Sequence, residues 1–172
     1  MDRRKFLESG VLLGVVASGL STVVATSSVH AVGGQNGWRW CNKCQGIFYV
    51  ANGSPGVCPA GGGHNWRGSM DYRLVTDANA PGQNQWRWCQ KCQGLFYVGN
   101  GTAGVCPSSY GHDWFGSMDY RLVADANAPG QNQWRWCQKC QGLFYVGNGT
   151  AGVCPKGGRH DSRGSMDYHL VA

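Results

Sequence analysis

Short runs in which apolar and polar residues alternate recur along the chain, separated by glycine-rich turns. In residues 38–40 two tryptophans flank an arginine, and in residues 69–75 Met, Tyr and Leu alternate with Asp and Arg. Alternation with a period of two is typical of strands with one buried face. Residues 47–50 form a further apolar and aromatic run, and Asn-Gly at positions 52–53 predicts a turn after it. We therefore expect an all-β protein, with no amphipathic helix after residue 31.

The same pattern occurs three times at a constant interval, so that Trp38, Trp86 and Trp134 are equivalent. Residues 77–107 are identical to residues 125–155, whereas the first copy has diverged further. Polar segments that contain Pro-Gly lead into the second and third copies and read as connectors. We divide the chain into an N-terminal segment, 1–31, and three repeats, 32–76, 77–124 and 125–172.

The N-terminal segment has the features of an export signal. Arg3, Arg4, Phe6 and Leu7 resemble the motif of twin-arginine signal peptides, and the apolar run that follows them is diluted by glycine and serine. Such a run is not apolar enough for a membrane span, which needs about 20 predominantly apolar residues. With cleavage after Ala31, the resemblance implies export by the twin-arginine machinery, a periplasmic or secreted mature protein and no stable membrane span. An uncleaved anchor is the alternative.

Cysteine and histidine recur at fixed spacing in every repeat. Each repeat carries Cys-x2-Cys-x13-Cys-x5-His, and all 9 cysteines belong to these sets. An odd number of cysteines cannot all pair within one chain, whereas three cysteines and one histidine supply the four ligands of a tetrahedral zinc site. We predict three Zn²⁺ ions, one per repeat, bound by Cys41, Cys44, Cys58 and His64, by Cys89, Cys92, Cys106 and His112, and by Cys137, Cys140, Cys154 and His160.

Other interpretations of these residues stay open. The first two cysteines of each repeat could form a disulfide or a redox pair, with the third reduced or paired elsewhere. A zinc site with four protein ligands leaves no open position for water, so we expect no catalysis at the metal and no enzyme. Asp71, Asp119 and Asp167 read as hydrogen-bonding strand residues or as partners of the histidines rather than as general bases.

The aromatic residues supply the remaining functional hint. A net charge of +6 is too small to indicate nucleic-acid binding, and zinc held by thiolates would lower it further. Tryptophan and tyrosine close to arginine suit stacking on sugar rings, although the same residues could simply pack a core. The candidate ligand-binding residues are Trp38, Arg39, Trp40, Tyr49, Trp86, Arg87, Trp88, Tyr97, Trp134, Arg135, Trp136 and Tyr145.

Two functions compete on this reading. The first is an exported binding module that presents three equivalent surfaces to an extracellular or envelope ligand such as a glycan, with avidity gained from repetition. The second is a metal-handling or thiol-redox protein of the cell envelope. A secreted hydrolase comes third, because the predicted sites are closed.

The string Trp-x-Trp-Cys-x-Lys-Cys-x-Gly-(Leu/Ile)-Phe-Tyr, which starts at Trp38 and recurs in each repeat, resembles repeats of uncharacterised secreted bacterial proteins. The Cys-x2-Cys knuckle with the later cysteine and histidine looks like a zinc ribbon. The resemblance covers nearly the whole chain after residue 31 and implies a small metal-stabilised β fold, without an activity. Three zinc-ribbon-like β units in a row, each folding nearly alone, are the first expectation. One closed three-fold body, such as a β-trefoil or β-prism, is the alternative.

Overall fold

The computed structural model describes residues 33–172, so the predicted signal segment, 1–31, lies outside the described residues. Each repeat contributes three strands to this part of the chain. They are β1 (Gly34–Trp40), β2 (Ile47–Tyr49), β3 (Tyr72–Val75), β4 (Gln83–Trp88), β5 (Leu95–Tyr97), β6 (Tyr120–Leu122), β7 (Gln131–Trp136), β8 (Leu143–Tyr145) and β9 (Tyr168–Leu170). Within residues 33–172, no helix is long and apolar enough to cross a membrane.

The three strands of a repeat form a small antiparallel sheet around its first strand. In the first repeat β1 pairs with β2 on one side and with β3 on the other, so that Trp38 lies opposite both Tyr49 and Tyr72. Strands β4 and β7 take the same central place in the other repeats. The register of β1 shifts between Gln35 and Trp38, where Gly37 has a φ of 90°. This bulge turns the tryptophan toward the centre of the molecule, because the extra residue changes the face on which the following side chains lie.

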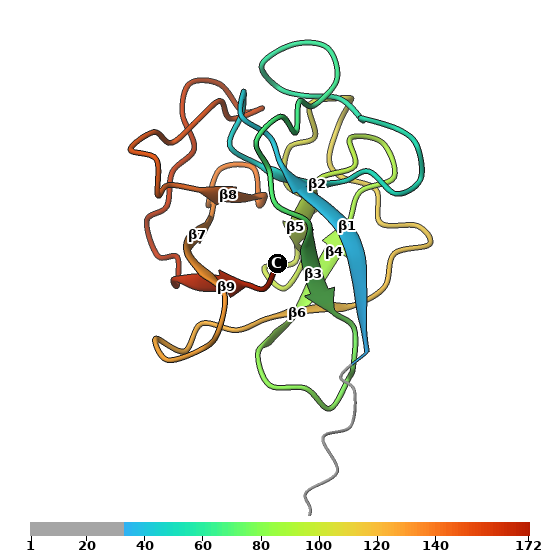
Figure 1. Ribbon diagram of the computed structural model, residues 1–172. Helices are drawn as coiled ribbons and strands as arrows, with labels where there is room; N and C mark the ends of the chain where they lie inside the picture. The colour runs from blue at the N-terminus through green and yellow to red at the C-terminus, as the bar shows by residue number, and fades with distance from the viewer. Residues whose placement is uncertain (1–32) are drawn as a thin grey trace, which may run out of the picture.

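The repeats are joined to one another in a cycle. At one end β3 pairs with β6, and isolated bridges connect Val123 to His169 and Arg73 to Val171. At the other end the bridges between Phe48 and Gly94, between Phe96 and Gly142, and between Phe144 and Gly46 also close a ring. Figure 1 shows the three strand triplets arranged around a common centre, with the third triplet in orange and red. The result is a nearly closed, barrel-like β body with approximate three-fold symmetry.

One hydrophobic core fills the centre of this body. Its members are Trp38, Ile47, Tyr72 and Leu74 with their equivalents in the other two repeats. Edge-to-face ring pairs cross every boundary between repeats, with centroid separations of 5.1–5.3 Å: Trp38 with Tyr120, Tyr72 with Trp134, and Trp86 with Tyr168. Burial of these side chains is therefore completed by a neighbouring repeat.

The shared core corrects the expectation of three units in a row. The prediction of an all-β protein is confirmed, but the tryptophan, tyrosine and leucine of each repeat pack against the other repeats instead of forming a core of their own. A unit of this size buries too little apolar surface to stand alone. The architecture thus corresponds to the alternative, a closed three-fold body.

Candidate metal centres

The structure brings the twelve predicted cysteine and histidine ligands together in three clusters. In the first repeat, Cys41 and Cys44 flank the turn between β1 and β2, while Cys58 and His64 come from the loop between β2 and β3. The four potential ligand atoms of each cluster lie within 4.8 Å of one another. Each cluster can hold one metal ion, as the spacing predicts.

Two separations within each cluster match tetrahedral coordination. The sulfur atoms of Cys41 and Cys58 are 3.9 Å apart, and the Cys44 sulfur lies 3.5 Å from Nδ1 of His64. The second and third clusters repeat both distances. A tetrahedral zinc ion, with bonds of about 2.3 Å to sulfur and 2.05 Å to nitrogen, would separate two sulfurs by about 3.8 Å and a sulfur from a nitrogen by about 3.6 Å. Disulfide sulfurs lie about 2.05 Å apart, and all nine cysteines are free.

A backbone turn shapes each cluster. The Gln45 N–H donates to the carbonyl of Cys41 at 2.8 Å, the Cys41 N–H donates to Gly46, and the Asn65 N–H donates to the Cys41 sulfur at 3.4 Å. Gln45 takes the left-handed conformation in this turn, with a φ of 69°, and Gln93 and Gln141 do the same.

Sequence reasoning missed the buried side chain of this glutamine. Gln45 is 3% exposed, and its Oε1 accepts hydrogen bonds from Nε1 of Trp40 at 3.1 Å and from the amide of Asn148 at 2.6 Å. Asn148 belongs to the third repeat, so the knuckle of one candidate metal site is tied directly to a neighbour. The same bonds join Asn52 to Gln93 and Asn100 to Gln141.

Electrostatics favour a cation in each cluster. Hydrogen bonds with Cys44 and Cys58 hold the pKa of the Cys41 thiol far below its usual range, whereas the same contacts and burial raise the pKa of Cys44 well above it. Burial acts to lower the pKa of His64, but hydrogen bonding with Cys41 and Cys58 outweighs it and raises the pKa to about 8. Three sulfurs this close cannot all ionise beside one another in a buried site unless a positive charge joins them.

The histidines are fixed by stacking. The ring of His64 lies 4.4 Å from that of Phe48 and nearly parallel to it, and His112 and His160 stack in the same way on Phe96 and Phe144. In each case Nδ1 faces a cysteine of the cluster, while the buried Nε2 has no hydrogen-bond partner. Ligation through Nδ1 would leave the proton on Nε2.

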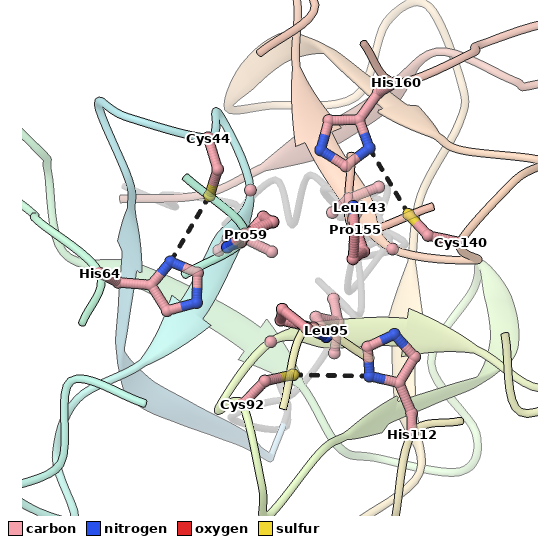
Figure 2. Close-up of a pocket in the computed structure, with 15 residues that line it drawn as sticks. Cys44, Pro59, His64, Cys92, Leu95, His112, Cys140, Leu143, Pro155 and His160 are labelled. Atoms are coloured by element: carbon pink, nitrogen blue, oxygen red, sulfur yellow. Dashed lines mark hydrogen bonds between the residues drawn. The ribbon is translucent and has the colours of Figure 1, made fainter. Parts of the chain in front are cut away.

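The three clusters surround one small pocket on the three-fold axis. Its volume is about 40 Å³, and apolar side chains such as Ile47, Leu95 and Leu143 line it together with the three histidines. Figure 2 shows each Cys-His pair at the rim of this pocket, with Pro59, Pro155, Leu95 and Leu143 closer to its centre. The space suits one or two water molecules rather than a substrate.

The recurring aspartates do not support the histidines. Asp71 accepts a hydrogen bond from the Gly37 N–H at 2.8 Å and forms an ion pair with Arg39 at 3.3 Å. The corresponding ion pairs are Arg87 with Asp119 at 2.9 Å and Arg135 with Asp167 at 2.5 Å. The aspartates are hydrogen-bonding residues, as one of the two readings expected, but each lies just before a strand and not within it.

The candidate ligand-binding residues separate into three groups. Trp38, Trp86 and Trp134 are completely buried, so they are corrected from surface residues to core residues. The three arginines are half-buried and held by the aspartates. Trp40, Trp88, Trp136, Tyr49, Tyr97 and Tyr145 remain partly exposed, and they pack against the outside of the core.

The partly exposed residues meet between repeats. Trp40 lines a groove with Met70, Tyr145 and Asn148, so that two repeats contribute to one hollow of about 140 Å³. At the next boundary the ring of Trp88 lies 6.4 Å from that of Tyr49. Sequence reasoning missed Met70, which is 45% exposed, and the pairing of Trp40 with another repeat.

Comparisons with protein-family models, with curated proteins and with solved structures find no match for this chain.

Proposed function

We propose that this chain is an exported, non-enzymatic zinc protein, in which three structural zinc ions hold a three-fold β body and the grooves between repeats bind an extracellular or envelope glycan. The metal part of the proposal rests on the three clusters of three cysteines and one histidine. Thiolate and imidazole ligands in tetrahedral array favour zinc among common divalent ions.

A structural role for zinc is supported by burial. The nine cysteines are at most 5% exposed, and backbone N–H groups point at the Cys41, Cys89 and Cys137 sulfurs. A site with four protein ligands and no exposed edge offers no position for a substrate. It also exchanges metal slowly, which weighs against the metal-handling alternative.

The groove lined by Trp40, Tyr145 and Asn148 carries the binding part of the proposal. Aromatic rings stack on the apolar faces of sugars, while an amide and a tyrosine hydroxyl can meet sugar hydroxyl groups. From the repeat symmetry we expect equivalent grooves beside Trp88 and Trp136. A polymer that reached two of them would gain affinity through effective concentration, without any better single contact.

A glycan and envelope-fragment binding screen of the zinc-loaded protein, residues 32–172, tests the proposal. We expect Met70→Glu to weaken binding of a polymeric ligand, because Met70 lines the groove and is 45% exposed. The triple change at Met70 and at its equivalents Met118 and Met166, which are also exposed, should abolish binding. Tyr110→Ala, which alters an exposed side chain elsewhere, is the matched control. Binding that survives the triple change would exclude the grooves, and an empty screen would exclude glycans.

A further inference from the structure

The second and third repeats differ almost entirely in one surface patch. Outside that patch the two copies differ at one position, which is Arg121 in the second repeat and His169 in the third. Inside it, the second repeat has Ser108, Ser109, Tyr110, Gly111, Trp114 and Phe115, where the third has Lys156, Gly157, Gly158, Arg159, Ser162 and Arg163. The patch is therefore aromatic in the second repeat and basic in the third, and at one position Phe115 directly replaces Arg163.

In the third repeat this patch contains an arginine side chain, Arg163, that is bound by the carboxylate of Asp161. The Arg163 Nε lies 3.1 and 3.0 Å from the two carboxylate oxygens of Asp161, and its Nη2 lies 2.6 Å from Oδ2. The Asp161 carboxylate is positioned by Gln138, whose amide donates to Oδ2 at 2.8 Å, and by the Arg163 N–H. The ion pair is bidentate, a geometry that the planar guanidinium of arginine provides and the ammonium of lysine does not.

The second repeat keeps the acceptor and replaces the arginine. Asp113 receives the same bonds as Asp161, from the amide of Gln90 at 2.7 Å and from the Phe115 N–H at 3.0 Å. Phe115 occupies the position of Arg163 and is 79% exposed, beside Trp114, which is 45% exposed. Asp113, Trp114 and Phe115 line an open hollow of about 720 Å³. A carboxylate that shares an open hollow with exposed aromatic rings is an environment that attracts an organic cation.

Lys91 also lines this hollow but does not take the place of the arginine. Its ammonium donates to Ser109 Oγ at 2.8 Å and to the carbonyls of Tyr110 and Gly111 at 3.1 and 2.7 Å. The equivalent Lys139 makes the same kind of loop contacts in the third repeat, where Arg163 still pairs with Asp161.

We propose that the second repeat binds a guanidinium group from outside the chain, at the place that Arg163 fills in the third repeat. Asp113 accepts hydrogen bonds from two of the N–H donors of this group, and Trp114 and Phe115 cover the faces of the group. The ligand class is an arginine side chain or a small molecule that carries the same group. The site is separate from the grooves between repeats, so it stands or falls independently of glycan binding.

An NMR titration of the zinc-loaded protein with Nα-acetyl-arginine amide tests this site. We expect saturable shifts of the Trp114 indole N–H. Nα-acetyl-citrulline amide, which has nearly the same shape without the charge, should bind at least about fivefold more weakly. Equal binding of both compounds would overturn the proposal. Acetyl-Gly-Arg-Gly-amide distinguishes the sources, since tighter binding than that of the arginine amide indicates a peptide partner and equal binding a site for the group alone.

Variants in the two repeats serve as mutual controls. Asp113→Asn and Phe115→Arg should each abolish binding of the arginine amide, the first by removing the acceptor and the second by filling the site from within, whereas Asp161→Asn should leave it unchanged. The double change Ser162→Trp and Arg163→Phe should create a second site and double the stoichiometry. This gain cannot result from misfolding. Undiminished binding by Phe115→Arg, or no second site in the double variant, would contradict the proposal.

Discussion

The glutamine between the second cysteine and the glycine of each knuckle connects three parts of the molecule. Gln93 has a φ of 67° and is 4% exposed, and its Oε1 accepts hydrogen bonds from Trp88 at 3.0 Å and from Asn52 of the first repeat. A single side chain thus shapes the candidate metal site, orients a groove tryptophan and joins two repeats. In the sequence motif this position was only a variable residue between the second cysteine and the glycine. No local sequence pattern indicates which donors a buried amide side chain will bind.

Replacement of this glutamine should be costly. Gln93→Leu leaves the Trp88 and Asn52 donors without their acceptor, so we expect the free energy of unfolding to fall by about 1–3 kcal/mol in urea titrations. Gln85→Leu is the control, because Gln85 also has a positive φ, of 66°, but is exposed. A similar loss in both variants would assign the effect to backbone strain instead of the lost acceptor.

Stability should also fall at alkaline pH through buried tyrosines. Burial raises the pKa of Tyr72 and Tyr168 to about 12, compared with 10 for a free tyrosine. A group whose pKa is higher in the folded chain stabilises it fully below pH 10 and loses that contribution as the pH rises toward 12. Unfolding by urea at several pH values, with absorbance at 295 nm, should show this decline. A variant with Tyr72→Phe and Tyr168→Phe should show less of it, and an unchanged pH dependence would contradict the assignment.

At the scale of strands, the sequence predicted the elements better than their connections. The runs at 38–40, 47–50 and 69–75 contain the parts of β1, β2 and β3 that face the core. Alternation indicated the burial of Tyr72 and Leu74 correctly, but Met70 precedes β3 and is 45% exposed. The bulge between Gln35 and Trp38 was not predicted. It has no single residue signature, since Gly37 occupies it in the first repeat and glutamine in the other two.

The bulge residue is matched to a turn residue across the hairpin. A Cβ on Gly37 would lie 2.7 Å from the Cβ of Ala51, whereas the other repeats combine Gln85 with Gly99 and Gln133 with Gly147. We expect Gly37→Gln to lower the free energy of unfolding by about 1–3 kcal/mol, the usual cost of overpacking. Adding Ala51→Gly should restore most of the loss, as a double-mutant cycle would show. Additive effects would mean that the two positions do not interact.

At the scale of the whole molecule, the sequence predicted the metal clusters and the three-repeat β arrangement, but not the core that the repeats share. Ligand spacing is a local property, so the four residues of each cluster could be assigned without knowing the fold. The partner of an apolar face is not local: Trp38 meets Tyr120, and its alternation with Arg39 does not indicate which repeat will cover it. Because every repeat has a complete ligand set, the sequence suggested that each repeat folds independently. The shared core does not allow this.

Metal removal should unfold the body as one unit. A strong chelator should release zinc slowly and in step with the change in tryptophan fluorescence, because each metal cluster packs against a neighbouring repeat, as Val153 does at Cys44. Zinc release can be followed with a chromogenic indicator, and Cys106→Ser should lower the zinc content from three ions to two. Rapid release without a change in fluorescence would favour the metal-handling alternative instead.

Because both rings of strand pairing are closed, the body has no structurally first repeat. In the described part of the chain, Gly34 lies opposite Val75 and Val171 bridges to Arg73, so the first and third repeats meet at a place equivalent to the two connectors. A circular permutant opened at a connector, or a homotrimer of one repeat, could make the same contacts. Fusion of three copies into a single chain then frees each to change alone, which a symmetric homotrimer cannot do. Phe115 in one copy and Arg163 in another are differences of that kind.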